Sequence, residues 1–397
     1  MNTAGRQKIV LLGMMSKIPV AGVIWQTAHY LVGLQRLGFD VYYVEEHART
    51  PTTLMREETD DGSLLAADLI ARVMRKFDIG ADRWCFHALH DDGRYLGMSE
   101  SQLATVFREA ALIINLHGGT VPLPHHYATN RLVYLETDPV ALQIELFHQQ
   151  QSTIDFLEPH CAFFTFGENY GRPGCKLPVS DRFKFHPTRQ PVVMDFWGND
   201  SVASNDAFTT IGNWEQVTRT VKFNGDEYHW SKHFEFLKFI DLPALTSQAF
   251  ELALASYSPE VKVMLESKGW RVRDAMKFSM DADLYRSYII DSRAEYTVAK
   301  DQNVRLRSGW FSDRSVTYLA AGRPVVTQET GFSDIFPTGA GLFGFSSIDE
   351  ILQAVERING DYKKHSIAAT QIARDYFSYD VVLRDLVTTC GLHCSSR

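Results

Sequence analysis

Compact apolar runs alternate with amphipathic segments along the whole chain. The run KIVLLGMM (8–15) precedes a segment with helical spacing of its apolar residues, VIWQTAHYLVGLQRLGFD (23–40), and then a second apolar run, VYYVEEH (41–47). Short apolar runs are typical of buried strands, and apolar positions three and four residues apart are typical of helices. Strand, helix and strand with short joins predict a parallel α/β layer.

The same alternation continues to residue 139. Helices are expected at SLLAADLIARVMRKFDI (63–79) and LATVFREA (103–110), and strands at ALIINLHGG (111–119) and RLVYLETDP (131–139). Each of these strands ends in polar or glycine-containing sequence, which is where a parallel sheet gathers its ligands.

A change of composition marks a junction between two domains. The stretch from Pro187 to Ala207 combines prolines with Asn, Asp and Ser, which favours a linker over the interior of an element. The chain has 397 residues, more than one hydrophobic core usually supports. We therefore expect an N-terminal domain at 1–203 and a C-terminal domain at 204–397, with a ligand cleft between them.

The second half repeats the alternation. FTTIGNW (208–214) has the pattern of a strand, whereas YHWSKHFEFLKFIDL (228–242) and TSQAFELALAS (246–256) have a helical register. The segments SPEVKVMLESKGWRVRDA (258–275) and DADLYRSYIIDSRAEYTVAK (281–300) each predict a helix followed by a strand. Two successive α/β domains are the simplest account.

The composition narrows the class of protein. A formal net charge of −8 gives no general attraction to nucleic-acid backbones or anionic membranes, although a local basic groove is compatible with it. KIVLLGMM is too short to span a bilayer or to serve as the apolar part of a signal peptide. The odd number of cysteines, five, fits a reducing compartment. These features predict a cytoplasmic enzyme without stable membrane insertion.

Polar residues follow two of the expected strands and form the candidate acceptor side. Ligands bind at the carboxyl ends of strands in open parallel sheets, so His117, Glu136 and Asp138 are expected on one rim. His117 is the leading candidate for a general base, because it precedes two glycines that let a ligand approach the backbone. Glu136 and Asp138 are its rivals. A structural role stays open, with His117 hydrogen-bonded in its loop and Asp138 capping the helix whose first turn holds Pro139.

A helix-to-strand corner is the main candidate for a donor site. In DRSVTYLAAGRPVVTQETGF (313–332), Asp313 is placed to cap a helix. Arg307 and Ser308 lie just before this helix, whose amino terminus attracts anions such as a diphosphate. Thr317 lies one turn beyond Asp313, so the two side chains could address a ribose together. A capped surface helix is the structural alternative.

The same corner carries a resemblance to a known family. The run SVTYLAAGRPVVTQETGFSDIFPTGAGLFGF (315–345) resembles the donor-binding segment of nucleotide-sugar glycosyltransferases of the GT-B fold. The residues that match the family pattern are Gly322, Pro324, Val325, Gly331, Asp334 and Gly341. The ending ATQIARDYFSYDVVLRDLV (369–387) resembles the terminal helices of that fold. Together the two matches cover roughly the last fifth to quarter of the chain.

The resemblance implies a fold class, an activity and a site. It implies an α/β protein with two Rossmann-like domains that face a cleft, and terminal helices that pack back on the N-terminal domain. The activity would be that of a divergent bacterial glycosyltransferase of the group 1 type, moving a sugar from a nucleotide diphosphate sugar to a small-molecule or glycan acceptor. The donor-binding candidates are Asn213, Lys232, Arg307, Ser308, Asp313, Arg314, Thr317, Glu329, Thr330 and Gly331. The nucleotide sugar is a co-substrate, and we expect no other cofactor.

Two acidic positions of the family pattern are missing. Many retaining members carry a glutamate where this chain has Thr317, and another where it has Gly309. Asp313 or Glu329 could substitute, but the resemblance then implies neither retention nor inversion of the sugar's configuration. The alternatives are a nucleotide-sugar epimerase of the same fold and a non-catalytic protein that binds sugar nucleotides.

The sequence predicts a metal-independent enzyme. The Asp-x-Asp run from Asp281 to Asp283 immediately precedes a helix, where carboxylates serve as caps. His125 and His126 are adjacent, and neither histidines four residues apart nor cysteines at metal-ligand spacing accompany them.

Overall fold

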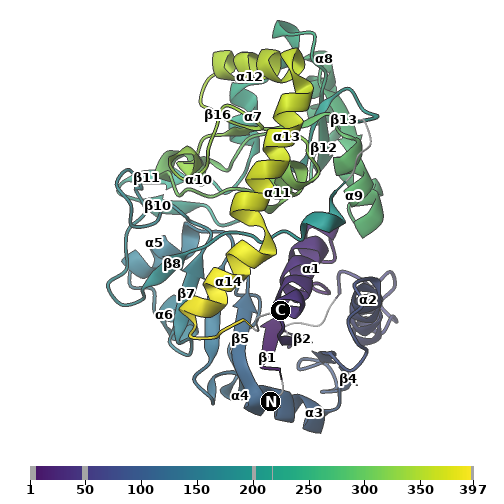
Figure 1. The fold of residues 1–397 in the computed structure, drawn as a ribbon, viewed down its shortest axis with the longest axis vertical. Helices are drawn as coiled ribbons and strands as arrows, with labels where there is room; N and C mark the ends of the chain where they lie inside the picture. Colours follow the sequence, from purple (N-terminus) through teal and green to yellow (C-terminus); the bar gives the residue numbers. More distant parts are fainter. Residues whose placement is uncertain (1–5, 47–51, 199–202, 217, 395–397) are drawn as a thin grey trace.

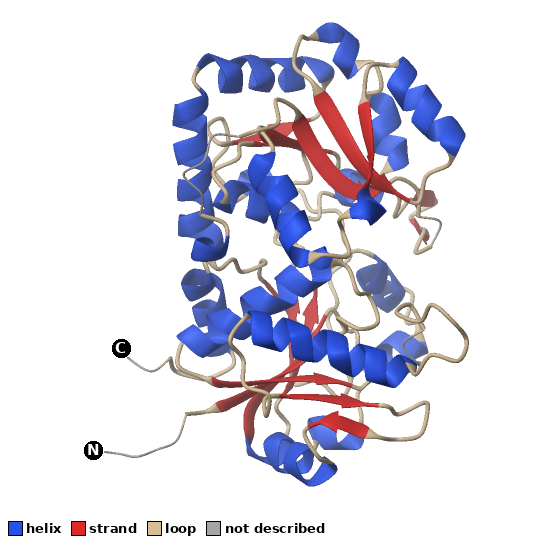
Figure 2. Cartoon of the chain, turned by 90° about the vertical axis from the view of Figure 1, so that its right-hand side faces the viewer, coloured by secondary structure: helices blue, strands red, loops and turns tan. Residues whose placement is uncertain are grey.

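The long strands form two separate sheets, one in each half of the chain. The computed structural model describes residues 6–46, 52–198, 203–216 and 218–394. Figure 2 shows the two sheets in red, one in the lower half of the molecule and one in the upper half. Residues 199–202, inside the expected linker, lie outside the described part, and the boundary at 203 stays a prediction.

The first sheet has eight strands in the order β4-β3-β2-β1-β5-β6-β7-β8, and only the pair β3 and β4 is antiparallel. The strands are β1 (Lys8–Leu12), β2 (Asp40–Glu45), β3 (Trp84–His87), β4 (Tyr95–Gly97), β5 (Ala110–Leu116), β6 (Leu132–Glu136), β7 (Ala162–Thr165) and β8 (Phe185–Pro187). The helices of this half are α1 (Ala21–Arg36), α2 (Gly62–Lys76), α3 (Glu100–Glu109), α4 (Pro124–Tyr127), α5 (Ala141–Phe147) and α6 (Gln151–Leu157).

The second sheet has six parallel strands in the order β13-β12-β9-β14-β15-β16, the order of a doubly wound dinucleotide-binding fold. The strands are β9 (Phe208–Asn213), β12 (Phe250–Ala255), β13 (Arg271–Asp274), β14 (Ala294–Thr297), β15 (Val325–Gln328) and β16 (Leu342–Phe345), and a separate hairpin is formed by β10 (Val221–Phe223) and β11 (Asp226–Tyr228). The helices are α7 (His233–Lys238), α8 (Pro259–Ser267), α9 (Ala282–Asp291), α10 (Asp301–Leu306), α11 (Asp313–Ala320), α12 (Ile348–Gly360), α13 (Tyr362–Ile372) and α14 (Tyr379–Thr389).

Both sheets reverse their strand order at an internal point. In the first sheet β1 lies between β2 and β5, and in the second β9 lies between β12 and β14. Ligands of open α/β sheets bind outside the carboxyl ends of the strands at such a point. His117 directly follows β5, and Asn213 ends β9, so each half places a predicted site residue at its switch point.

One expected helix is a strand. The segment TSQAFELALAS contains β12, which pairs with β9 and β13 in the interior of the second sheet. Leu252 and Leu254 pack into the core on one face of the sheet, whereas Ala253 packs into the core on the other. A strand buried on both faces is apolar throughout and lacks the alternation of a half-exposed strand. The prediction of a helix there is wrong for that reason.

The helix-to-strand corner has its predicted order but a shifted cap. α11 is followed by Gly322, whose φ of +68° ends the helix as expected, and then by β15. Ser312 holds the cap position without a side-chain capping bond, and Asp313 is the first helical residue. The prediction of a cap at Asp313 is therefore wrong by one residue. Asp281 does cap α9, because its carboxylate accepts hydrogen bonds from two backbone amides of the first turn.

The C-terminal helices join the two halves. α13 continues through a π-helical turn, Ala373–Phe377, into α14, and Figure 1 shows this yellow run passing from the upper half onto the lower half beside α1. Gly33 of α1 permits the close approach, because a Cβ there would lie 2.6 Å from Leu383 Cδ1 of α14.

Two further observations concern the helices and the cysteines. None of the described helices combines the length and the apolar composition needed to cross a bilayer. The cysteines are unpaired thiols in the described part of the chain. A cytoplasmic location stays a prediction.

Candidate functional site

The carboxyl ends of the two sheets meet at an ion pair. Asp138 follows β6 of the first sheet, and Lys300 follows β14 of the second. Lys300 Nζ lies 2.9 Å and 2.8 Å from the two carboxylate oxygens of Asp138, and Trp230 Nε1 donates to Oδ2 at 2.5 Å. The N-cap of α5 is Val140, which makes no side-chain capping bond. Asp138 thus bridges the halves, and the alternative of a helix cap is wrong.

His117 lies at the same junction. Its Nδ1 is 2.8 Å from Thr137 Oγ1, and Trp310 Nε1 of the second half donates to the Thr137 carbonyl at 3.1 Å. His117 Nε2 is buried without a hydrogen-bond partner among the described residues. Burial lowers the pKa of His117 to about 4, so the ring is neutral at pH 7 and one of its nitrogens can accept a proton.

Glu136 holds its proton at neutral pH. The residue is 2% exposed, and one carboxyl oxygen accepts hydrogen bonds from Gln143 Nε2 at 3.1 Å and Thr165 Oγ1 at 2.5 Å. Burial raises the pKa of Glu136 to about 8, against the smaller lowering by these hydrogen bonds. A protonated carboxyl group cannot act as a general base, so the raised pKa of Glu136 favours His117 for that role.

An unpaired ammonium group lies beside the switch point of the second sheet. Lys232 directly precedes α7, is half-buried, and makes no hydrogen bond or ion pair with another described residue. Burial, together with the like charge of Arg314, holds the pKa of Lys232 well below its usual value, although Glu295 acts in the opposite direction. A buried lysine without an ion-pair partner gains by binding an anion, because the anion stabilises its protonated form.

Arg314 holds the strands beside Lys232 in place. Its Nε donates to Glu295 Oε1 at 2.6 Å, its Nη2 to Thr297 Oγ1 at 2.9 Å, and its Nη1 to the Ile211 carbonyl. These partners lie on β14 and β9, so the guanidinium ties α11 to the two strands that flank the switch point. Each nitrogen of Arg314 already has a protein acceptor, which suits a residue that positions the site.

The approach of the two halves explains one departure from the family pattern. Gly309 has a φ of +77°, and a Cβ there would lie 2.4 Å from the backbone nitrogen of Asn169. Asn169 N donates to the Ser308 carbonyl at 3.1 Å, and Asn169 Nδ2 to the Arg307 carbonyl at 3.0 Å. Any side chain at position 309, a glutamate included, would collide with the first half in this arrangement.

The other donor candidates use their polar groups locally. The contacts are Arg307 Nη2 with Asp334 Oδ2 (3.0 Å), Ser308 Oγ with Asn303 Oδ1 (2.8 Å), Glu329 Oε1 with Gly331 N (2.6 Å), and Thr330 Oγ1 with the Trp310 carbonyl (2.7 Å). The polar run after β15 therefore builds a turn. Direct contact of these residues with a donor stays a prediction.

Asp313 and Thr317 line a cavity of about 10 Å³ where α11 meets α1. The Thr317 hydroxyl donates to the Arg314 carbonyl at 2.6 Å. A space of this size holds about one water molecule, so a ribose could enter only if α1 withdrew. The contact of these two residues with a ribose stays a prediction.

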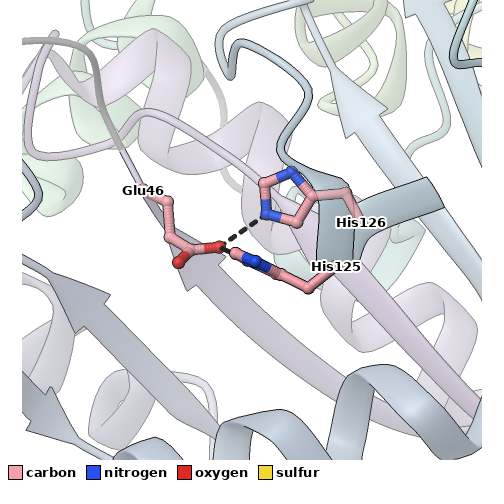
Figure 3. A group of neighbouring side chains, drawn as sticks. All are labelled: Glu46, His125 and His126. Atoms are coloured by element: carbon pink, nitrogen blue, oxygen red, sulfur yellow. Dashed lines mark hydrogen bonds and ion pairs between the residues drawn. The ribbon is translucent and has the colours of Figure 1, made fainter. Parts of the chain in front are cut away.

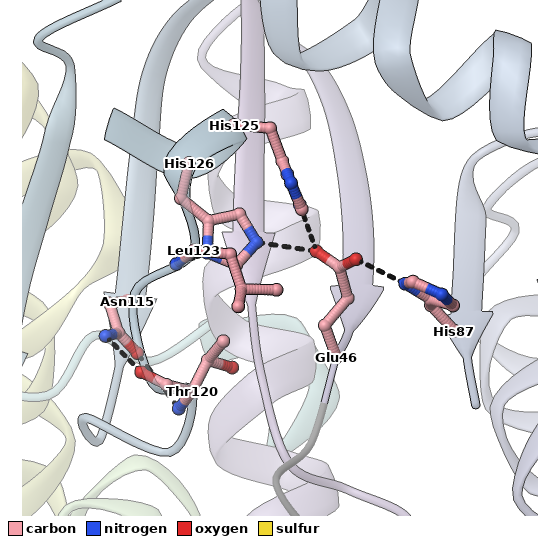
Figure 4. A network of polar contacts seen from close by, with 7 residues as sticks. All are labelled: Glu46, His87, Asn115, Thr120, Leu123, His125 and His126. Carbon is pink, nitrogen blue, oxygen red and sulfur yellow. Dashed lines mark hydrogen bonds and ion pairs between the residues drawn. The ribbon is translucent and has the colours of Figure 1, made fainter. Parts of the chain in front are cut away.

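A second polar cluster lies on the first sheet, at Glu46, His87, His125 and His126 (Figure 4). Glu46 is 2% exposed, and its oxygens lie 2.7 Å from His87 Nδ1, 2.9 Å from His125 Nε2 and 2.5 Å from His126 Nε2. Burial alone would raise the pKa of Glu46, but hydrogen bonds from the three imidazoles outweigh it and hold the pKa well below its usual range. Glu46 is thus a buried anion with three N–H donors.

The ring of His126 disfavours a metal ion in this cluster. One ligand atom each from Glu46, His125 and His126 lies within 4.8 Å of the others, and Figure 3 shows both rings directed at the same carboxylate. His126 Nδ1, however, accepts the Leu123 N–H at 3.0 Å, which places the ring proton on Nε2. A protonated Nε2 has no lone pair for a metal, and metal-bound histidines usually donate through their other nitrogen. Metal independence of the protein stays a prediction.

Four residues of these sites were not found from the sequence: Lys300, Trp230, Glu46 and His87. Lys300 and Glu46 each come shortly after the end of a parallel strand, where polar residues are candidates for a ligand rim, so that rule could have found them. Trp230 lies between β11 and α7 and carries no comparable signal.

Comparison with known proteins identifies the fold. No family model and no curated protein matches the sequence. A crystal structure of HepE from Anabaena in complex with UDP and glucose is 13% identical with a TM-score of 0.56, and the match covers 98% of this chain and 100% of that chain. A structure of an alpha-glucosyltransferase in complex with UDP and a 13-mer DNA containing a HMU base is 8% identical with a TM-score of 0.57, with the same coverage. The predicted GT-B-like α/β fold is confirmed.

Proposed function

We propose that this chain is a glycosyltransferase that takes its sugar from a nucleotide diphosphate sugar. The donor would bind at the carboxyl edge of the second sheet, and the first sheet would present the acceptor. The observation that carries the proposal is the unpaired ammonium group of Lys232 beside the switch point of β9 and β14. UDP is the first nucleotide to test, because the structures of HepE and of the alpha-glucosyltransferase contain it.

Catalysis would rest on positioning and on charge. As the bond between sugar and diphosphate breaks, negative charge grows on the leaving phosphate, and a fixed cation in a dry site stabilises that charge. Lys232 supplies such a cation, and Arg314 holds the strands that carry the site. His117 is neutral at pH 7, so it is the residue of the first rim that we propose to accept a proton from the acceptor hydroxyl.

The acceptor is proposed to be a small molecule or a glycan. The alpha-glucosyltransferase structure contains DNA, but the net charge of −8 gives this chain no general attraction to a nucleic-acid backbone.

A thermal-shift screen against UDP, GDP, dTDP, ADP and CMP and their sugars tests the proposal. A ligand that binds only the native state at a hundredfold excess over its Kd stabilises it by about 2.7 kcal/mol. Lys232→Met should abolish the shift caused by the preferred nucleotide. Lys238→Met is the matched control, because Lys238 lies on α7, is exposed and pairs with Glu235. No shift with any nucleotide, or equal shifts in both variants, would overturn the proposed donor site.

A further inference from the structure

The carboxylate of Asp138 is surrounded by cations and a hydrogen-bond donor, the groups that bind an anion. Both of its oxygens contact Lys300 Nζ, and one of them accepts the indole N–H of Trp230. The Lys300 ammonium lies 3.8 Å from the centre of the Trp230 ring, and its side chain is only 10% exposed. Arg219 adds a second positive group, with Nη1 3.5 Å from Asp138 Oδ2. The cations and the indole belong to the second half of the chain, whereas the anion comes from the first.

The position of this anion overlaps with the proposed donor site. Lys300 comes just after β14, which flanks the switch point of the second sheet. Trp310 connects Lys232 to this anion, because its ring centre lies 6.0 Å from Lys232 Nζ and its Nε1 donates at 3.1 Å to the carbonyl of Thr137, the residue before Asp138. Asp138 pairs with Lys300 and Arg219 and leaves Lys232 without an ion-pair partner among the described residues, with the Trp310 ring 6.0 Å from its ammonium group. A diphosphate carries more charge than one carboxylate and could engage both lysines.

We propose that Asp138 occupies the place of a donor phosphate, so that a nucleotide diphosphate must displace it from Lys300 and Trp230 in order to bind. This inference rests on the proposed donor site. Asp138 is then an internal competitor that sets the affinity for the donor. Because it also joins the two halves, donor binding would release one of the contacts between them. Asp138 would then differ from a catalytic base. Mutation of a catalytic base would leave the affinity for the donor largely unchanged, whereas mutation of Asp138 would raise it.

Titration calorimetry with UDP on the full chain tests the inference. Asp138→Asn keeps the shape of the side chain and removes the charge that competes with the phosphate. We expect this variant to bind UDP about tenfold more tightly than the wild type, a change of ~1.4 kcal/mol. Lys300→Met should weaken binding at least as much, because it removes a cation from the phosphate position.

A second ion pair between the halves provides the matched control. Lys76 of α2 lies 2.5 Å from Asp283 of α9, outside the proposed donor site, and Asp283→Asn should leave the UDP affinity unchanged. Circular dichroism establishes that each variant is folded, and Asp138→Ala repeats the test if the asparagine variant is not.

The outcomes separate the two proposals. UDP binding by the wild type that is lost in Lys232→Met but not tightened in Asp138→Asn would overturn the competitor and keep the donor site. Equal tightening by Asp138→Asn and Asp283→Asn would also overturn it, since general loosening of the halves would then be the cause. Absence of UDP binding in every form, together with no response to other nucleotides, would overturn both proposals.

Discussion

Substitution of Gly309 by alanine tests whether the contact between the two halves is as close as the structure has it. Gly309 N donates to the Thr330 carbonyl at 2.7 Å, and the Ser308 carbonyl accepts from Asn169 N at 3.1 Å. A Cβ at position 309 would lie 2.4 Å from that same nitrogen of Asn169. This neighbour is backbone, so it cannot turn away as the end of a flexible side chain could.

Two costs add at this position. A φ of +77° costs an alanine about 1–2 kcal/mol through the left-handed backbone alone. Forcing one extra carbon into a packed contact adds about 1–3 kcal/mol. Gly171 isolates the first cost, because its φ is +75° and a Cβ there would meet nothing within 4 Å. The greater freedom of glycine in the unfolded chain affects both positions alike and cancels in the comparison.

Thermal unfolding of the two variants measures the difference. One kcal/mol shifts the melting temperature by about 2–4 °C for a unit of 150–250 residues, so Gly309→Ala should melt roughly 2–12 °C below Gly171→Ala. Equal melting temperatures would contradict the close contact, because they would show that the halves leave room for a side chain at position 309. The family's glutamate would then be absent for another reason.

Three further predictions concern the buried charges. Arg314→Met leaves the fully buried Glu295 without its cation and should lower the free energy of unfolding, measured in urea, by about 3–5 kcal/mol. The additional change Glu295→Gln should restore part of this stability. Full stability of the single variant would contradict the role of Arg314. Burial raises the pKa of Glu136 from 4.5 to about 8, so its stabilising effect is complete below pH 4.5 and is lost as pH rises through 8. Between pH 4.5 and pH 8 the melting temperature should therefore fall less steeply with pH in Glu136→Gln than in the wild type. An equal pH dependence in the two proteins would contradict the burial of the acid. Purified protein should carry far less than one zinc ion per chain by elemental analysis, because His126 Nε2 holds a proton; a full equivalent that is lost in His125→Ala would show that this assignment is wrong.

The sequence predicted the elements best where one face of a segment is polar. α2 follows its amphipathic pattern, and Asp61, which directly precedes it, caps it with its carboxylate. β12 was misread because both of its faces are buried, so that periodicity no longer distinguishes a strand from a helix. The strand-end rule placed His117 and Asp138 on the rim, since it depends only on local order along the chain.

The contact partners of the rim residues could be identified only once the position of one sheet relative to the other was known. Asp138 and Lys300 are 162 positions apart, and neither segment contains a pattern that predicts contact with the other. The tautomer of His126 is set by a hydrogen bond from the backbone amide of Leu123, and the spacing of histidines along the sequence does not reveal this contact. The sequence therefore predicted which edge of each sheet carries the polar groups. Only the fold could show that Asp138 pairs with Lys300 and that Lys232 has no ion-pair partner among the described residues.

A crystal structure of the protein with UDP would locate the donor site. We expect UDP at the carboxyl edge of the second sheet, with a phosphate oxygen within hydrogen-bond distance of Lys232 Nζ. A nucleotide bound elsewhere, or a protein that takes up no nucleotide at millimolar UDP, would contradict the proposed donor site.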